Sequence, residues 1–217
     1  KFSTLKRRLA SISVIHKLSG HYIDTKHPMI TENLMGIKRV KGSFQKGKKP
    51  ILIKHLKSII NVIDEQKIED IKKYRDKSII LIGFGGGFRR TELISIDHED
   101  LEFVPEGLKI TIKRSKTDQF GEGMIKGLPY FTNETYCPIV NLKKWLEITK
   151  IKSGPIFRRF SKGLSLTDKR LTDQTVALLI KEYLTLAGID KKNFSGHSLR
   201  SGFATVAAES GADERSI

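Results

Sequence analysis

The sequence is poor in cysteine and has no long hydrophobic run. Cys137 is the single cysteine among 217 residues, which excludes an internal disulfide and a cysteine-rich zinc site and fits a reducing, cytoplasmic compartment. No stretch approaches the ~18 consecutive apolar residues that a membrane-spanning helix needs, so no membrane partner is expected. No signal peptide is recognisable, and because residue 1 is Lys we expect the natural N-terminus to lie upstream.

Acidic residues are scarce relative to basic ones. The 40 Lys and Arg against 24 Asp and Glu give a net charge of +16 and a pI near 9.9. Residues 1–54 hold 13 Lys and Arg but only two acids, a net charge of +11. Such a basic segment favours a polyanion, most commonly nucleic acid, although a plainly solvated surface is the alternative interpretation.

Motifs for metal and nucleotide chemistry are missing. No cluster of carboxylates is spaced to hold two magnesium ions, which argues against a metal-dependent nuclease, and we expect neither metal nor other cofactor. The glycine cluster at residues 83–87 (GFGGG) lacks the Gly-Lys-Ser/Thr ending of a phosphate-binding loop. It therefore predicts a tight turn in which the backbone packs closely.

Hydrophobic periodicity predicts an α+β fold that is mainly helical. Residues 101–104, 108–113 and 124–128 should form a small three-stranded antiparallel sheet. Trp145 should lie in the core. Helices are expected near residues 3–18, 31–37, 54–63, 68–84, 88–96, 138–148, 172–187 and from about 195 or 197 towards 211.

The domain organisation follows from composition. Residues 43–50 read as a basic linker, since Lys, Gly and Pro dominate there. The two helices before it are too few to close a core, so residues 1–42 are interpreted as the end of a larger domain. In the first helix, Leu5, Leu9, Ile12 and Ile15 form the expected apolar stripe. A second domain is expected over residues 51–217.

Four polar side chains stand at helix starts and at a hairpin end: Arg89, Lys116, His197 and Arg200. Two guanidiniums can bind the non-bridging oxygens of a phosphodiester and stabilise the charge that builds during attack. Histidine can hydrogen-bond or carry a proton, and a lysine can protonate a leaving oxygen. The set suits a phosphodiester under attack, although a bare H-x-x-R motif is more often an ordinary surface feature.

Three ordered motifs together resemble tyrosine recombinases of the phage integrase family. Residues 87–93 (GFRRTEL) resemble the box of the first catalytic arginine, and residues 115–118 (SKTD) resemble the hairpin of the catalytic lysine. Residues 197–200 (HSLR) resemble the H-x-x-R box. Residues 1–42 resemble the end of the helical core-binding domain of that family, so the similarity spans nearly the whole chain.

The resemblance implies a reaction and a role for each residue. A tyrosine attacks a DNA phosphate, giving a 3′-phosphotyrosine and a free 5′-hydroxyl, and rejoining to a new strand follows without metal or ATP. Arg89 and Arg200 would clamp the phosphate, Lys116 would be the general acid, His197 would assist, and Glu92 would steady Arg89. Contacts to the DNA backbone are expected from Arg7, Arg8, Lys38, Arg39, Lys46, Lys48, Lys49 and Arg90.

One departure from the family keeps alternatives open. The nucleophilic tyrosine follows the H-x-x-R helix in the family, whereas all five tyrosines here precede it. We therefore expect a truncated recombinase, which as given binds DNA without cleaving it. A non-catalytic DNA-binding remnant or accessory protein and a type IB topoisomerase-like enzyme are the alternatives. The resemblance also implies a prokaryotic, nucleoid-associated protein that acts as a tetramer on two DNA duplexes.

Overall fold

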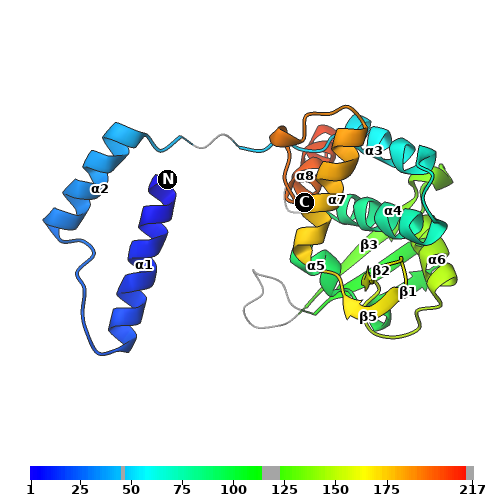
Figure 1. Cartoon of the computed structure of the whole chain (residues 1–217), viewed down its shortest axis with the longest axis horizontal. Helices are drawn as coiled ribbons and strands as arrows, with labels where there is room; N and C mark the ends of the chain where they lie inside the picture. The colour runs from blue at the N-terminus through cyan, green and yellow to red at the C-terminus, as the bar shows by residue number, and fades with distance from the viewer. Residues whose placement is uncertain (45–46, 114–122, 214–217) are drawn as a thin grey trace. The chain divides into compact units, whose positions relative to one another are not determined.

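The computed structural model of the chain describes residues 1–44, 47–113 and 123–213. The chain divides into two compact units, Lys1–Gly47 and Lys48–Ile217 (Figure 1). The three motifs named above all belong to the second unit, so the fold of that unit positions the residues of the candidate site. Lys46 and Lys116 lie outside the described residues.

The first unit consists of two helices, α1 (Phe2–Leu18) and α2 (Pro28–Lys41). Neither helix holds a buried residue, and the stripe expected to face a core is largely exposed, with Leu5 38%, Ile12 48% and Ile15 62% accessible. Two helices alone cannot bury such a stripe, because each offers the other only one face.

Helix α2 is longer than the predicted helix over residues 31–37, and the prediction of its start was wrong. His27 provides the N-cap, since its Nδ1 accepts the Met29 N–H at 3.3 Å, and Pro28 stands in the first helical turn. A histidine cap is not among the usual start signals, which are Ser, Thr, Asp and Asn. At its other end the helix runs to Lys41, so that Lys38 and Arg39 lie exposed on its last turn.

The second unit joins helices to two small sheets. Its helices longer than one turn are α3 (Ile53–Glu65), α4 (Asp70–Gly85), α5 (Arg90–Ser95), α6 (Pro138–Thr149), α7 (Asp173–Leu186) and α8 (Ser198–Glu209). Its strands are β1 (Leu101–Val104), β2 (Gly107–Ile112), β3 (Met124–Pro129), β4 (Arg158–Phe160) and β5 (Leu166–Arg170). Short 3-10 turns are η1 (His98–Asp100), η2 (Glu134–Tyr136) and η3 (Lys191–Asn193).

Helix α4 crosses the middle of the second unit and packs against α3, α5, α6, α7 and α8 (Figure 1). Every residue from Arg75 to Phe84 is buried, because neighbouring elements surround the helix. The buried charges in this stretch are paired, Arg75 with Asp76 at 2.8 Å and Lys77 with Asp64 at 2.9 Å. Trp145 of α6 is fully buried, and its indole N–H donates to the Ile156 carbonyl at 2.8 Å. The expectation that Trp145 is a core residue is confirmed.

The predicted three-stranded antiparallel sheet is confirmed, with strand order β1-β2-β3. Along β2 the inward side chains of Leu108, Ile110 and Ile112 alternate with exposed ones. Ile110 pairs with Leu101 of β1 and with Lys126 of β3.

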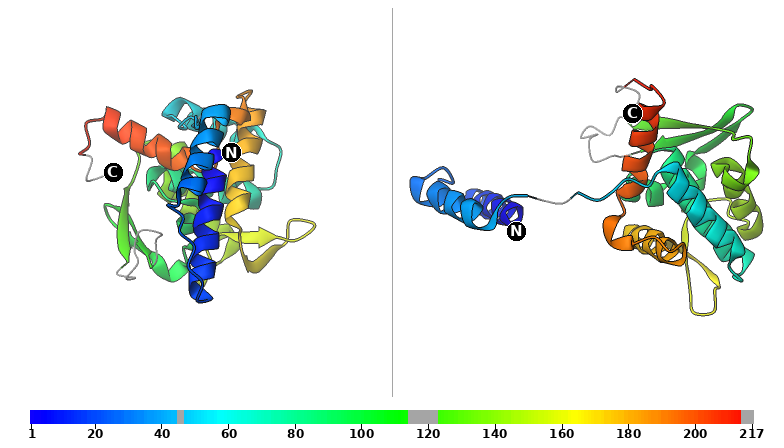
Figure 2. Two further views of the ribbon diagram at one scale, coloured as in Figure 1. Left: turned by 90° about the vertical axis from the view of Figure 1, so that its left-hand side faces the viewer. Right: turned by 90° about the horizontal axis from the view of Figure 1, so that it is seen from above.

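A second hairpin, β4–β5, was not predicted. Figure 2 shows it projecting from the unit in both of its views. Phe160 ties it to the body, with its ring 6.5 Å from Trp145 and 4.2 Å from the guanidinium of Arg75. The hairpin lacked a strand signal because charged residues fill the positions where apolar alternation is expected.

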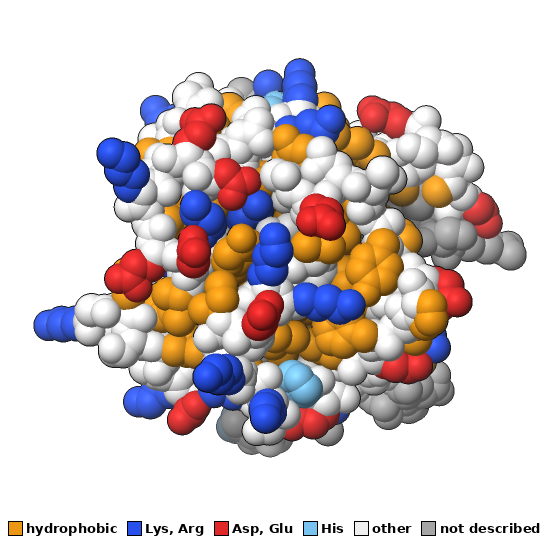
Figure 3. Space-filling model, turned by 90° about the vertical axis from the view of Figure 1, so that its right-hand side faces the viewer, with side chains coloured by type: hydrophobic (Ala, Val, Ile, Leu, Met, Phe, Trp, Pro, Cys, Tyr) orange, Lys and Arg blue, Asp and Glu red, His pale blue; other side chains and the backbone are white. Residues whose placement is uncertain are grey.

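Charges of both signs cover the face drawn in Figure 3, with hydrophobic side chains between them. Elsewhere in the second unit the ammonium of Lys143 lies 5.2 Å from the ring centroids of both Phe103 and Tyr130. Among the described residues, no helix combines the length and the hydrophobicity that crossing a membrane requires.

Candidate active site

The site begins at a glycine turn, Gly86 and Gly87, which ends α4. Gly87 has φ +55°, and a Cβ there would lie 2.6 Å from the Phe203 ring, so glycine is required on both counts. The turn leads directly to Arg89, the N-cap residue of α5. The expectation of a tight turn at the glycine cluster is confirmed.

The carboxylate of Glu92 binds both the backbone and the guanidinium of Arg89. It accepts the Arg89 backbone N–H at 2.9 Å and the Arg89 Nη1 at 2.5 Å. The Glu92 side chain is only 4% exposed, whereas that of Arg89 is 23% exposed. A carboxylate three residues into a helix is a favourable cap, and here it also orients a guanidinium towards solvent.

Arg200 joins the same group from the first turn of α8. Its Nη1 donates to the Gly87 carbonyl at 2.8 Å and lies 4.0 Å from Glu92 Oε2. The fold thus gathers Arg89, Arg200 and the buried Glu92 around one turn, although the two arginines are far apart in the sequence. Since Arg200 is 36% exposed, an anion can reach the cluster from solvent.

His197 is the exposed N-cap residue of α8. The turn before it is closed by two hydrogen bonds, from the Ser195 N–H to Ser198 Oγ at 2.9 Å and from the His197 N–H to Ser195 Oγ at 3.3 Å. Across the described ranges of the chain, no group bonds to the His197 ring. The imidazole is therefore presented to solvent on the same helix turn as Arg200.

Arg90 lies beneath this turn. A Cβ on Gly196 would come within 2.2 Å of the Arg90 side chain, so Gly196 leaves the space that Arg90 fills. Its Nη2 is 3.5 Å from Asp173 of α7, and its buried Nε has no hydrogen-bond partner within the described chain. Arg90 consequently connects the starts of α5 and α7 with the His197 turn.

The beginning of the second unit is bound to this region, which the sequence did not reveal. The Lys49 N–H donates to Asn193 O at 2.7 Å, and the Ile51 N–H donates to Ser198 O at 2.9 Å. Lys48 Nζ donates to Lys192 O at 2.5 Å. These bonds place two of the expected DNA-contacting lysines beside the H-x-x-R helix.

Lys126 is a further residue that sequence reasoning missed. Its Nζ donates to the Gly86 carbonyl at 2.6 Å, which brings a third cation to the glycine turn. The sequence carried no signal for it, because a lysine within a strand normally faces solvent.

Tyr183 of α7 is a core residue. It is 1% exposed, its hydroxyl donates to Asp76 Oδ2 at 2.7 Å, and Lys72 donates to it at 2.9 Å. Burial raises the pKa of Tyr183, with Asp76 acting in the same direction.

In the part of the chain that the structure describes, no group of three or more His, Cys, Asp or Glu side chains is placed to hold a metal ion.

Comparison with known proteins gives consistent matches. The model of the phage integrase family matches residues 51–217. An integrase/recombinase xerD homolog of Selenomonas ruminantium is 42% identical over 220 residues, covering 100% of this chain and 64% of that protein. The tyrosine recombinase XerD of Staphylococcus haemolyticus is 29% identical over 164 residues, covering 75% of this chain and 50% of that protein. The chain therefore spans only half to two thirds of these relatives.

Solved structures share the fold. The Tn1549 transposon integrase in complex with circular intermediate DNA has a TM-score of 0.62 at 14% identity, covering 100% of this chain and 69% of that one. The XerH site-specific recombinase in a post-cleavage complex with its difH substrate has a TM-score of 0.58 at 20% identity, covering 79% and 45%. A lambda integrase tetramer bound to a Holliday junction has a TM-score of 0.53 at 15% identity, covering 86% and 54%.

Proposed function

Because the chain belongs to the phage integrase family, we propose that it is part of a site-specific recombinase that cleaves and rejoins DNA through a 3′-phosphotyrosine intermediate. The observation that carries this proposal is the cluster of Arg89 and Arg200 around the buried Glu92. Two partly exposed guanidiniums on one carboxylate leave an excess of positive charge, which suits a single phosphodiester.

In the proposed reaction Arg89 and Arg200 bind the non-bridging oxygens of the scissile phosphate. Their contribution rises as negative charge builds on the pentavalent transition state, so they accelerate the chemical step more than they tighten binding. Glu92 acts through Arg89 by fixing its backbone and its guanidinium.

The two remaining residues of the motif set are assigned a hydrogen bond and a proton transfer. His197, whose ring faces solvent beside Arg200, hydrogen-bonds the phosphate or the attacking hydroxyl. Lys116 protonates the leaving 5′-oxygen as the general acid, and this role rests on the SKTD motif alone, since Lys116 lies outside the described residues. The nucleophilic tyrosine is not among the residues that we assign in this chain.

The proposed partner is double-stranded DNA, bound by the basic residues of α1, α2 and the segment that follows, with Arg90 as a further contact. We extend the proposal to a homotetramer on two duplexes, since the similar lambda integrase is a tetramer bound to a Holliday junction. The location proposed from the resemblance is the prokaryotic cytoplasm. Light scattering of the full-length protein with and without a duplex of its site tests the assembly. A monomer on DNA would contradict it.

A cleavage assay tests the proposed function. In the full-length protein, Arg89→Ala and Arg200→Ala should each slow covalent attachment to a nicked suicide duplex ~100- to 1000-fold, the loss typical of one charge-stabilising donor. DNA affinity should change little. Arg159→Ala, an exposed arginine of β4, is the matched control and should cleave normally. Unimpaired cleavage by the Arg89 and Arg200 variants would overturn the assignment, and relaxation without strand exchange would indicate a topoisomerase-like enzyme.

A further inference from the structure

Lys126 occupies a position of β3 where the strand faces the core. It pairs with Ile110 of β2, which is fully buried, and Leu128, two residues further along the same face, is 2% exposed. Cross-strand partners lie on the same side of a sheet, so the Lys126 stem points inward. Lysine is rarely placed there unless its charge has a specific partner.

The ammonium of Lys126 ends at the glycine turn. Its Nζ donates to the Gly86 carbonyl at 2.6 Å and lies 5.0 Å from the centroid of the Phe88 ring. Arg200 donates to the next carbonyl, Gly87 O, at 2.8 Å. Two cations from different elements, β3 and α8, therefore hold consecutive carbonyls of the turn that precedes Arg89.

The location is electrostatically unfavourable for a cation, even with Glu92 nearby. Burial is the largest cause that lowers the pKa of Lys126, and the charge of Arg200 lowers it further, whereas Glu92 raises it. Among the described residues, the three cations Lys126, Arg89 and Arg200 surround the carboxylate of Glu92 and leave a net positive site. Such an arrangement becomes favourable when a negatively charged phosphate enters and offsets the repulsion.

We propose that Lys126 is a positioning residue of the phosphate site, which fixes the turn at Gly86 and Gly87 so that Arg89 and Arg200 act on one phosphate. The inference rests on the proposed phosphodiester chemistry and adds a residue to it. Lys126 touches the turn rather than the reacting atoms, so it acts through the two arginines. Its positive charge also adds to the field at the phosphate.

The test replaces Lys126 by Met, which keeps the length of the stem and removes the charge and the donor. In the full-length protein, Lys126→Met should slow suicide-substrate cleavage about 10- to 100-fold, the range typical of supporting residues, with DNA affinity nearly unchanged. Lys126→Arg, which restores charge and donor, should recover part of the rate. A merely structural role would lower the melting temperature without this recovery.

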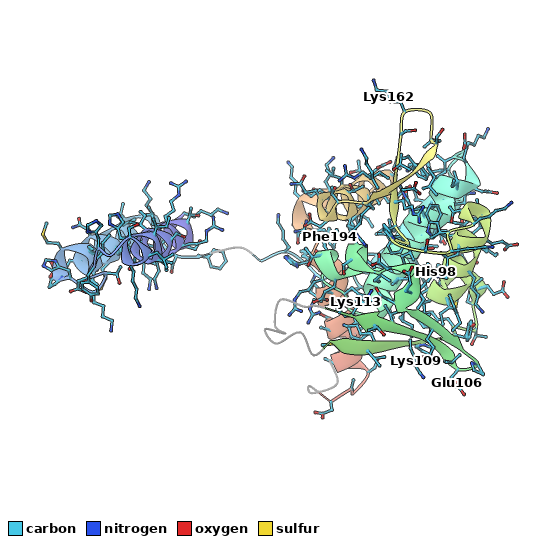
Figure 4. All side chains as sticks on the ribbon, turned by 90° about the horizontal axis from the view of Figure 1, so that it is seen from below. His98, Glu106, Lys109, Lys113, Lys162 and Phe194 are labelled. Atoms are coloured by element: carbon cyan, nitrogen blue, oxygen red, sulfur yellow. The ribbon has the colours of Figure 1, made fainter. Side chains whose placement is uncertain are left out.

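Lys109→Met is the matched control. Lys109 lies on β2 near the β1–β2 turn and Glu106, at the opposite end of the strand from Lys113, as Figure 4 shows. Its ammonium is exposed and pairs with Glu102 at 3.2 Å, so this variant should cleave at the wild-type rate. Wild-type cleavage by Lys126→Met, or a loss that Lys126→Arg does not relieve, would overturn the inference.

A second measurement separates this inference from the proposed function. Orthophosphate titrated into the chain should shift the amide NMR signals of Gly87 and Arg89, with affinity about threefold weaker in Lys126→Met and unchanged in Lys109→Met. Equal affinity in wild type and Lys126→Met refutes the role of Lys126 even if the wild type fails to cleave DNA. A wild type that fails to cleave refutes the proposed function alone.

Discussion

Replacing Glu92 by Gln removes the only negative charge that faces Arg89 and Arg200 within the described site, at almost constant side-chain volume. The amide oxygen of Gln can still accept the Arg89 N–H, which the carboxylate accepts at 2.9 Å. The variant therefore isolates the loss of charge from the loss of the helix cap. The free protein should become less stable, because two guanidiniums then face each other without a counterion.

The expected loss of unfolding free energy depends on how deeply the charged groups are buried. Breaking a fully buried ion pair costs ~3–5 kcal/mol. Arg89 is 23% and Arg200 36% exposed, so water screens part of the repulsion and we expect about 2 kcal/mol of lost unfolding free energy. For a unit of this size, that loss corresponds to a melting temperature lower by about 4–8 °C.

Thermal melting with and without DNA provides the assay. A duplex of the recombination site should narrow the difference between Glu92→Gln and wild type, because the phosphate supplies the missing negative charge. Glu102→Gln is the control, since Glu102 is 65% exposed and pairs with the exposed Lys109 on the surface. A Glu92→Gln protein that melts like the wild type, or a difference that DNA leaves unchanged, would refute the reasoning.

Two further predictions concern pH and salt. His55 Nδ1 accepts the Leu52 N–H at 3.1 Å, and burial, with lesser contributions from neighbouring lysines, lowers the pKa of His55 below 6.5. At acidic pH the unfolded state then binds more protons than the folded state, so the free energy of unfolding should fall as the pH drops from 7 to 5. This fall should be smaller in His55→Gln than in the wild type, whereas the exposed control variant His16→Gln should behave like the wild type. The second prediction replaces Lys46, Lys48 and Lys49 of the linker region together by Ala. DNA binding should weaken equally on all duplexes, and the slope of log affinity against log salt concentration should become shallower by about 0.9 per lost phosphate contact. Unaltered binding in that variant, or a flat salt dependence of the wild type, would contradict the expected backbone contacts.

The elements that the sequence predicted well are those with strong local signals. The apolar run at Ile79 to Ile82 and the alternation along β2 each determine structure within a few residues. The β4–β5 hairpin and the start of α2 lacked such signals. In the hairpin, the contacts of Phe160 with Trp145 and Arg75 replace apolar alternation, and in α2 a His27 cap replaces the usual Ser or Asp.

The motifs could name candidate residues but not their arrangement in space. The motifs identified Arg89, His197 and Arg200, and the α4–α8 packing brings Arg200 to the Gly87 carbonyl. Lys126 escaped notice because a lysine within a strand is normally read as solvent-facing, and only the register with Ile110 shows that it points inward.

The close approach of α8 to the rest of the unit depends on two glycines outside any catalytic motif box. A Cβ on Gly83 of α4 would lie 3.1 Å from Leu199, and a Cβ on Gly202 of α8 would lie 2.0 Å from the Ile51 carbonyl. Larger residues would push α8 outward, and Arg200 would then lose the 2.8 Å bond to Gly87 that places it near Glu92. The spacing between helices, and not the motif residues alone, therefore determines whether the two arginines can reach one phosphate.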